Sequence, residues 1–152
     1  MKITKKGEYA LRSLLALASI YEGERAVAVR GIAEEEKLPI KFLEQIMMVL
    51  KQAGLVRSSK GKGGGYTLSR HPREITLGEI IRTVDGPLAP ISTASEIQKK
   101  IRKNDRDAGL YVTLLEVRNA ICEILDKKTL ADVLEKSFEL AWSEPANQMY
   151  YI

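Results

Sequence analysis

The feature that most constrains the fold is the order of three patterns in the first half of the chain. A short helical pattern covers residues 29–36, and a longer one follows three or four residues later, after Pro39. Apolar residues recur at helical spacing in the longer pattern: Leu43, Ile46, Met47 and Leu50. Two strand patterns, at 55–58 and 66–69, then bracket a glycine-rich turn. Two closely linked helices followed at once by a hairpin predict a winged helix-turn-helix.

The turn of this hairpin lies in the stretch SSKGKGGGYTLSR, at residues 58–70. It does not match the phosphate-binding frames GxxxxGK[ST] or GxGxxG, and it leads into a strand rather than a helix. From Arg57 to Arg73 there are five basic residues and no acidic one. An ordinary flexible hairpin would explain the glycines but not the missing acids. We therefore expect a wing tip that brings Lys60 and Lys62 to a sugar-phosphate backbone or minor groove.

The charge distribution favours a polyanionic partner for the first part of the chain. The 152 residues contain 24 Lys and Arg against 20 Asp and Glu, with a sequence pI of about 9.1. Residues 1–86 hold 15 basic and 10 acidic side chains, whereas residues 87–152 hold 9 and 10. The whole basic excess therefore accompanies the predicted helix-turn-helix.

The few cysteine and histidine residues exclude several kinds of site. Cys122 is the only cysteine and His71 the only histidine, so an internal disulfide and a zinc site of the usual ligands are excluded. A nucleophilic pair of Cys122 and His71 is the remaining enzymatic alternative. Neither residue stands in a recognisable catalytic motif, so we expect no enzyme activity.

The beginning of the chain imitates a targeting segment without matching one. Lysines precede an apolar stretch, but Glu8 and Arg12 interrupt it, and its apolar residues fall at helical spacing. We expect a helix from Thr4, its N-cap, to Gly23. No segment has the roughly 18 apolar residues in a row that a membrane span requires. These features predict a cytoplasmic protein without a membrane partner.

Further patterns divide the chain into segments. Thr76 and Glu79 form the pattern of a capping box for a helix that ends near Asp85, closing a DNA-binding domain at 1–86. A linker and basic loop, containing QKKIRKNDR, is expected at 87–109. A long dimerisation helix and a packing helix capped by Thr129 are expected at 110–142, with a tail at 143–152. The fold class is mainly α with a small β-hairpin wing.

The long helix carries an apolar seam with spacings of four, three, four and three residues: Leu110, Leu114, Val117, Ile121 and Ile124. An apolar face on a helix outside the first domain favours a partner, most simply the same helix of a second subunit. In the last helix we expect Leu130, Val133, Leu134 and Phe138 to face inward, with Trp142 packed near the tail.

Three stretches together resemble the Rrf-two family of bacterial transcription regulators: TKKGEYALRSLLALA, IAEEEKLPIKFLEQIMMVLKQAGLVRSSKGKGGGYTLSR and TLGEIIRTVDG. FLEQ in the third helix and GKGGGY in the wing are the most specific parts. The resemblance implies a homodimeric winged helix-turn-helix protein that binds a pseudo-palindromic DNA operator, commonly as a repressor.

The resemblance also implies which residues contact DNA. Lys41, Glu44 and Gln45 occupy places from which family members read bases, and Phe42 fills an aromatic position beside them. Lys60 stands where an arginine often enters the minor groove. Lys62, Gly64 and Tyr66 complete the expected wing contact. Plain solvent exposure is the alternative interpretation of Glu44 and Gln45.

The chain departs from the cluster-binding members of the family in one respect. Those members carry three closely spaced cysteines after the fourth helix, and the corresponding stretch here, DGPLAPISTASEIQKKIRKNDRDAG, has none. We expect no cofactor and no metal, and an effector protein or small ligand that acts at the linker. The alternative is a redox or protein-partner sensor that uses Cys122 or the linker and has reduced DNA binding.

The missing cysteines lead to a first prediction. Three thiolates of a family-type cluster cannot come from a chain with one cysteine. Protein purified without oxygen should be colourless, contain no stoichiometric iron or labile sulfide, and bind its operator without reconstitution. The absorption spectrum of a cluster in such a preparation would contradict this expectation.

Overall fold

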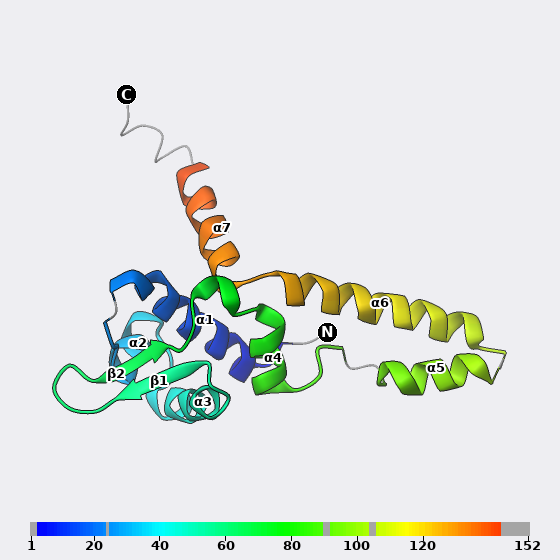
Figure 1. Ribbon diagram of the computed structural model, residues 1–152, viewed down its shortest axis with the longest axis horizontal. Coiled ribbons are helices and arrows are strands. Elements are labelled where there is room, and N and C mark those ends of the chain that lie inside the picture. The colour runs from blue at the N-terminus through cyan, green and yellow to red at the C-terminus, as the bar shows by residue number, and fades with distance from the viewer. Residues whose placement is uncertain (1–2, 24, 90–91, 104–105, 144–152) are drawn as a thin grey trace.

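Seven α-helices and one two-stranded sheet make up the described residues, 3–23, 25–89, 92–103 and 106–143, of the computed structural model. The α-helices are α1 (Lys5–Ser19), α2 (Val29–Glu35), α3 (Ile40–Gln52), α4 (Leu77–Asp85), α5 (Ala94–Arg102), α6 (Ala108–Lys127) and α7 (Leu130–Ser143). The strands are β1 (Val56–Ser59) and β2 (Gly65–Leu68), and two short 3-10 helices are η1 (Tyr21–Gly23) and η2 (Pro72–Glu74). In Figure 1, α5 and α6 project side by side from the unit formed by α1 to α4 and the hairpin, and α7 leaves it in another direction.

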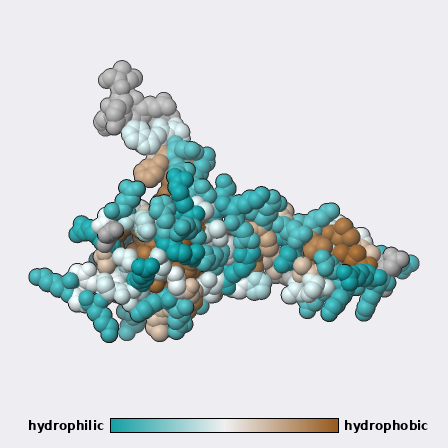
Figure 2. Space-filling model, viewed as in Figure 1, coloured by the Kyte–Doolittle hydropathy of each residue, from teal (hydrophilic) through white to brown (hydrophobic). Residues whose placement is uncertain are grey.

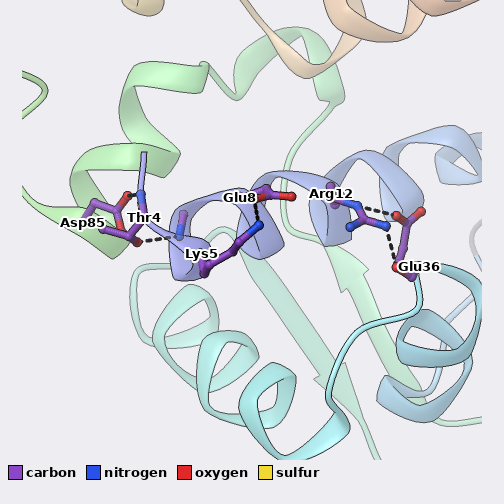
Figure 3. A network of polar contacts seen from close by, with 7 residues as sticks. Thr4, Lys5, Glu8, Arg12, Glu36 and Asp85 are labelled. Carbon is purple, nitrogen blue, oxygen red and sulfur yellow. Dashed lines mark hydrogen bonds and ion pairs between the residues drawn. The ribbon is translucent and has the colours of Figure 1, made fainter. Parts of the chain in front are cut away.

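Helix α1 connects the other helices of this unit (Figure 3). The Thr4 side chain caps it by accepting from the Gly7 N–H at 3.1 Å, and the Thr4 N–H donates to Asp85 of α4 at 3.0 Å. A Cβ atom on Gly7 would lie 2.2 Å from an Asp85 carboxylate oxygen, so a larger residue there would displace the Asp85 side chain. Further along α1, Arg12 donates to Glu36 at 2.9 Å and holds the end of α2.

The helix-turn-helix is formed by α2 and α3. Helix α2 ends in a Schellman motif, in which the N–H of Leu38 donates to Ala33 at 2.8 Å and that of Lys37 donates to Glu34 at 3.3 Å. Lys37 has the left-handed φ of 54° that this motif requires. Pro39 then precedes the first turn of α3, and Gly54, with a φ of 74°, closes α3 in the same way.

The wing is an antiparallel hairpin in which Val56 pairs with Leu68 and Ser59 with Gly65. Tyr66 and Val27 exchange backbone hydrogen bonds of 3.0 and 2.8 Å, so the segment before α2 lies along β2. A Cβ atom on Gly65 would meet the Val27 carbonyl carbon at 2.3 Å. The wing can therefore dock against the helix-turn-helix only because residue 65 has no side chain.

The corner between α6 and α7 is fastened to α4. The N–H of Leu77 donates to Lys128 at 2.8 Å, and that of Leu130 donates to Ile75 at 3.0 Å. Arg82 of α4 pairs with Asp126 of α6 through both carboxylate oxygens, at 2.8 Å for one of them. This pairing lowers the pKa of Asp126 and raises that of Arg82. These contacts together fix the orientation of α6 relative to α4.

The structure corrects several expectations about the elements. Helix α1 ends at Ser19 rather than Gly23, because the chain turns into η1. Thr76 caps α4, but Glu79 pairs with Arg70 instead of completing a capping box. The expected loop at 87–109 contains α5, which begins with the capping box of Thr93 and Glu96.

Helix α7 also differs in part from the expectation. Leu130 is fully buried, and Val133 and Leu134 are half-buried. Phe138 was expected to face inward and is 63% exposed, and Trp142 is exposed as well. Phe138 lines an open groove together with Ala18 and Ser19 of α1. Most of the expected tail, residues 144–152, lies outside the described residues.

The left-handed residue of the helix-turn-helix gives a stability prediction. A side chain at a left-handed position costs about 1 kcal/mol. Lys37→Gly should therefore stabilise the protein by up to about 1 kcal/mol, measured by urea unfolding at one protein concentration. Lys37→Ala is the control, because it removes the charge and keeps the strain. Equal effects of the two substitutions would show that the side chain, not the backbone, matters.

A second prediction concerns the docking of the wing. Gly65→Ala should destabilise the protein by about 1–3 kcal/mol, because the new methyl group overlaps the Val27 backbone. Gly61→Ala is a matched control in the same turn: its Cβ would meet nothing within 4 Å, so only the cost of its φ of 94°, about 1 kcal/mol, remains. Urea unfolding of both variants checks this, and equal losses would show that the overlap relaxes.

Candidate nucleic-acid interface

One side of α3 is buried and the opposite side is open to solvent. Leu43, Ile46, Met47 and Leu50 are completely buried in the core. Lys41, Glu44 and Gln45 are exposed on the other side, together with Met48 and Lys51. Since a helix exposes one face when the other is packed, these polar groups point away from the protein. They form a face that a major groove could accommodate.

Phe42 lies beside this face but is only half-exposed. Its ring meets Tyr9 of α1 edge-to-face, with centroids 5.8 Å apart and planes at 76°. It packs against the core and sets the position of the first turn of α3 relative to α1. The structure thus places Phe42 at the edge of the exposed face, half-buried against α1.

The wing tip carries the two expected lysines on an open turn. Lys60 and Lys62 are exposed, and Lys62 lies between glycines whose φ angles are 94° at Gly61 and 77° at Gly63. Gly64 is required for compactness, because a Cβ there would lie 2.5 Å from the Ser59 carbonyl oxygen. Figure 1 shows the tip extending past the helices.

Tyr66 differs from the two lysines of the tip. It is half-buried, packs against the hydrophobic core and pairs through its backbone with Val27. The structure brings α3 and the wing together in one unit. Within the wing, Gly64 and Tyr66 maintain the shape of the hairpin, whereas Lys60 and Lys62 are its exposed groups.

The charged groups of this surface have no ionic partner in the described part of the chain. No ion pair among the described residues involves Lys41, Glu44, Lys60 or Lys62. Exposed, flexible lysines of this kind can contact phosphates with little rearrangement. Glu44 can accept from an amino group on a base edge.

The sequence interpretation missed a groove at the base of the wing, which is lined by two arginines and by Glu22. Arg25 and Arg57 line a hollow of about 390 Å³ between η1 and the hairpin, and Arg57 donates to the Ser69 carbonyl at 3.0 Å. Arg57 belonged to the acid-free run and could have been included on that basis. Arg25 had no such signal, because only the fold brings it beside the strands.

The metal and catalytic alternatives find no support in the donor groups. Within the described residues no three His, Cys, Asp or Glu side chains form a metal-binding group. His71 caps η2 and stacks edge-to-face on Tyr21 at 5.2 Å, whereas Cys122 lies on α6 in a separate groove beside Arg82 and Arg118. With one cysteine in the whole sequence, the donors do not fit an iron–sulfur cluster.

The apolar seam of α6 is open in the single chain. Leu110, Val117 and Ile124 are 57%, 46% and 61% exposed, and Leu114 and Ile121 are half-buried. Among the described residues of α6 none is fully buried.

Helices of the described segments are too short or too polar to cross a membrane.

Comparison with known proteins places this geometry in a family. The model of the Rrf2 family, described as an iron-dependent transcriptional regulator, matches residues 3–136. The chain is 35% identical over 133 residues to the HTH-type transcriptional regulator CymR of Bacillus subtilis, covering 88% of this chain and 89% of that protein.

Solved structures of relatives have the same fold. That of CymR, the global cysteine regulator of B. subtilis, superposes with a TM-score of 0.75 at 34% identity over 90% of this chain and 98% of the other. IscR of T. potens gives a TM-score of 0.69 at 36% identity over 99% and 97%. The exposed face of α3, the basic wing and these matches lead to one conclusion: the chain belongs to the Rrf2 family of DNA-binding, winged-helix transcription regulators.

Proposed function

We propose that this protein is a homodimeric repressor that binds a pseudo-palindromic operator through α3 and the wing. The observation that carries the proposal is the two-sided character of α3. Its apolar side is completely buried, so Lys41, Glu44 and Gln45 project outward from a fixed frame. A fixed helix with free polar groups is suited to reading base edges in the major groove.

The two parts of the surface have different tasks. Lys41, Glu44 and Gln45 contact base edges, with Phe42 supporting them, and so determine sequence preference. Lys60 and Lys62 bring charge to the backbone or the minor groove, and Gly64 and Tyr66 hold the tip in shape. This division follows from chemistry. A lysine on a flexible tip binds a phosphate through its charge, whatever the neighbouring base, so it does not discriminate between sequences.

The seam of α6 provides the dimer contact. Three of its five residues are more than two-fifths exposed, which is an unfavourable arrangement for a helix without a partner. A twofold axis through α6 would bury the seam against its own copy. The two α3 helices would then enter successive major grooves about 34 to 36 Å apart, on half-sites on the order of 10 base pairs apart or a multiple of that.

Signal input occurs at the junction of the linker and α6, without a cluster. A groove of about 880 Å³ lies there, lined by Arg82, Arg118 and Cys122 together with residues 85–89. Arg82 also connects α4 to Asp126, so a small anion or partner protein in this groove would compete for the group that orients α6. Such an effector shifts DNA binding only if it prefers one arrangement of the dimer.

Binding to the DNA upstream of the protein's own gene tests the proposal directly. The protein should shift an inverted-repeat fragment in a gel, as a dimer, with an affinity that falls steeply as salt rises. When the same fragment is placed ahead of a reporter gene, expression of the reporter should be lower in the presence of the protein than in its absence. A monomeric complex whose affinity is independent of salt would overturn the proposal.

The division of tasks gives a pair of substitutions. Gln45→Ala should reduce discrimination between matched and scrambled operators by roughly 1 to 3 kcal/mol, because a base contact is lost. Lys62→Ala should weaken binding to both DNAs alike and lower the salt slope by about 1 per contact, because only a phosphate contact is lost. Titrations of both variants on both DNAs at several salt concentrations check this. Identical behaviour of the two variants would contradict the division.

The seam gives a prediction about assembly. Ile121→Glu should produce monomers with poor operator affinity, because a dimer would bury two unpaired carboxylates. Asn119→Glu is the control, since Asn119 is exposed on the opposite side of α6 and its charge stays in water. Sedimentation measures the assembly of both. An intact Ile121→Glu dimer would place the interface elsewhere.

A further inference from the structure

Helix α5 has two sides of opposite character. Ile97 is buried and Ile101 half-buried, on the side that packs against α6. Lys99, Arg102 and Lys103 recur at helical spacing on the other side and are all exposed. These three residues are called the α5 basic face below. Neither the family match nor the contacts of α3 and the wing explain why these basic residues gather on one side of α5.

The charge of this segment is local. Residues 93–106 contain five basic and two acidic side chains, whereas residues 108–143, which form α6 and α7, contain four basic and six acidic ones. A general basic character of the second half of the chain would have spread the excess evenly. The excess instead gathers on one short helix, as on a surface for an anionic partner.

Among the described residues, the α5 basic face has no acidic partner. No carboxylate among the described residues pairs with Lys99, Arg102 or Lys103. Glu96, the acid of α5 itself, accepts from the Thr93 N–H at 2.8 Å in the capping box, and this contact lowers the pKa of the Glu96 carboxyl. The helix dipole favours cations in the last turn of α5, but by only 0.3–1 kcal/mol each. This dipole effect is too small to explain why three exposed basic side chains lie on the same side of α5.

The position of α5 indicates the partner. In Figure 1, α5 lies below α6, and α3 lies along the same lower edge of the molecule, on the side away from the core. Because α6 lies above α5 in this view, and the elements that α3 contacts (α1, α2, α4 and β1) lie above α3, the free sides of both helices face this lower edge. Figure 2 shows hydrophilic side chains along this lower edge under α5. A DNA duplex lying across α3 would continue in the direction of α5.

We propose that the α5 basic face is a second DNA-contacting surface, which binds phosphates of the central operator segment between the half-sites. This rests on the proposed function. Because α5 packs on α6, which carries the proposed dimer seam, a twofold axis through α6 would place one copy of the face in each half of the dimer. Two copies of the face would meet the duplex on either side of its centre. Continuity with α3 favours DNA over an acidic protein as the occupant.

A charge-matched pair of triple variants tests this surface. The first changes Lys99, Arg102 and Lys103 to Gln. The control changes three exposed lysines of α6, its C-cap and α7, Lys127, Lys128 and Lys136, to Gln and so removes the same net charge. Operator affinity is measured as a function of salt for both variants and the wild type, and thermal unfolding and sedimentation confirm that each variant is a folded dimer.

The first variant should lower the salt slope by about 2 or more and weaken low-salt binding about tenfold or more, because each lost phosphate contact reduces the slope by about 0.9. Its ratio of matched to scrambled binding should stay that of the wild type, since no base contact is removed. The control should keep the wild-type slope. Equal slopes for the two variants would overturn the proposal and leave the face for an acidic partner protein.

Neutralising the DNA locates the contact. An operator with uncharged methylphosphonate links in its central segment should bind the wild type about tenfold more weakly than the unmodified operator does. The α5 variant should bind the modified and unmodified operators equally well. An equal loss for both proteins would overturn the central placement. Failure of the proposed function looks different, because the wild type would then show no preference for any operator and Gln45→Ala would change nothing.

Discussion

Complete burial of one side of α3 is the constraint on which the rest of the structure depends. Leu43, Ile46, Met47 and Leu50 lose all contact with water, and each such side chain contributes about 1.5–3 kcal/mol. Because these residues are spaced at helical intervals, their burial also fixes the rotation of α3 about its axis. The polar residues between them cannot turn inward. The chemistry presented to DNA is therefore a direct consequence of the packing of the core.

Close approaches at glycines join the parts around this core. Gly7 lets Asp85 reach the start of α1, and Gly65 lets the wing lie against the segment before α2. Gly78 of α4 does the same for α6, since a Cβ there would lie 2.1 Å from an Asp126 oxygen. Each approach allows a polar contact that a methyl group would block. The wing, the helix-turn-helix and the long helix are thus held as one arrangement.

This arrangement links the groove beside Arg82, the proposed site of signal input, to α3 through packed helices. The salt bridge of Arg82 and Asp126 and the backbone bonds on both sides of Thr129 connect the proposed dimer helix to α4. Asp85 at the other end of α4 contacts α1, which packs on α3. A change in the angle of α6 would therefore reach α3 through contacts between packed helices. Because packed cores are not continuously deformable, a small shift at the groove beside Arg82 would be transmitted rather than absorbed.

The helix-turn-helix, the wing and the polar character of α3 were predictable without the structure, because local periodicity and glycine placement carry that information. Thr4, Thr129 and the buried side of α3 were all identified from neighbours a few residues away. Tertiary structure decided the rest. The many charged residues at 94–102 left too weak an apolar pattern for a helix to be predicted there. Phe138 is 63% exposed in the single chain, and Glu79 pairs with Arg70 rather than with the start of its own helix. Contacts such as Val27 with Tyr66 and Arg82 with Asp126 join residues about forty positions apart. No local pattern specifies such a pair, because its energy arises only when the chain has brought both residues together.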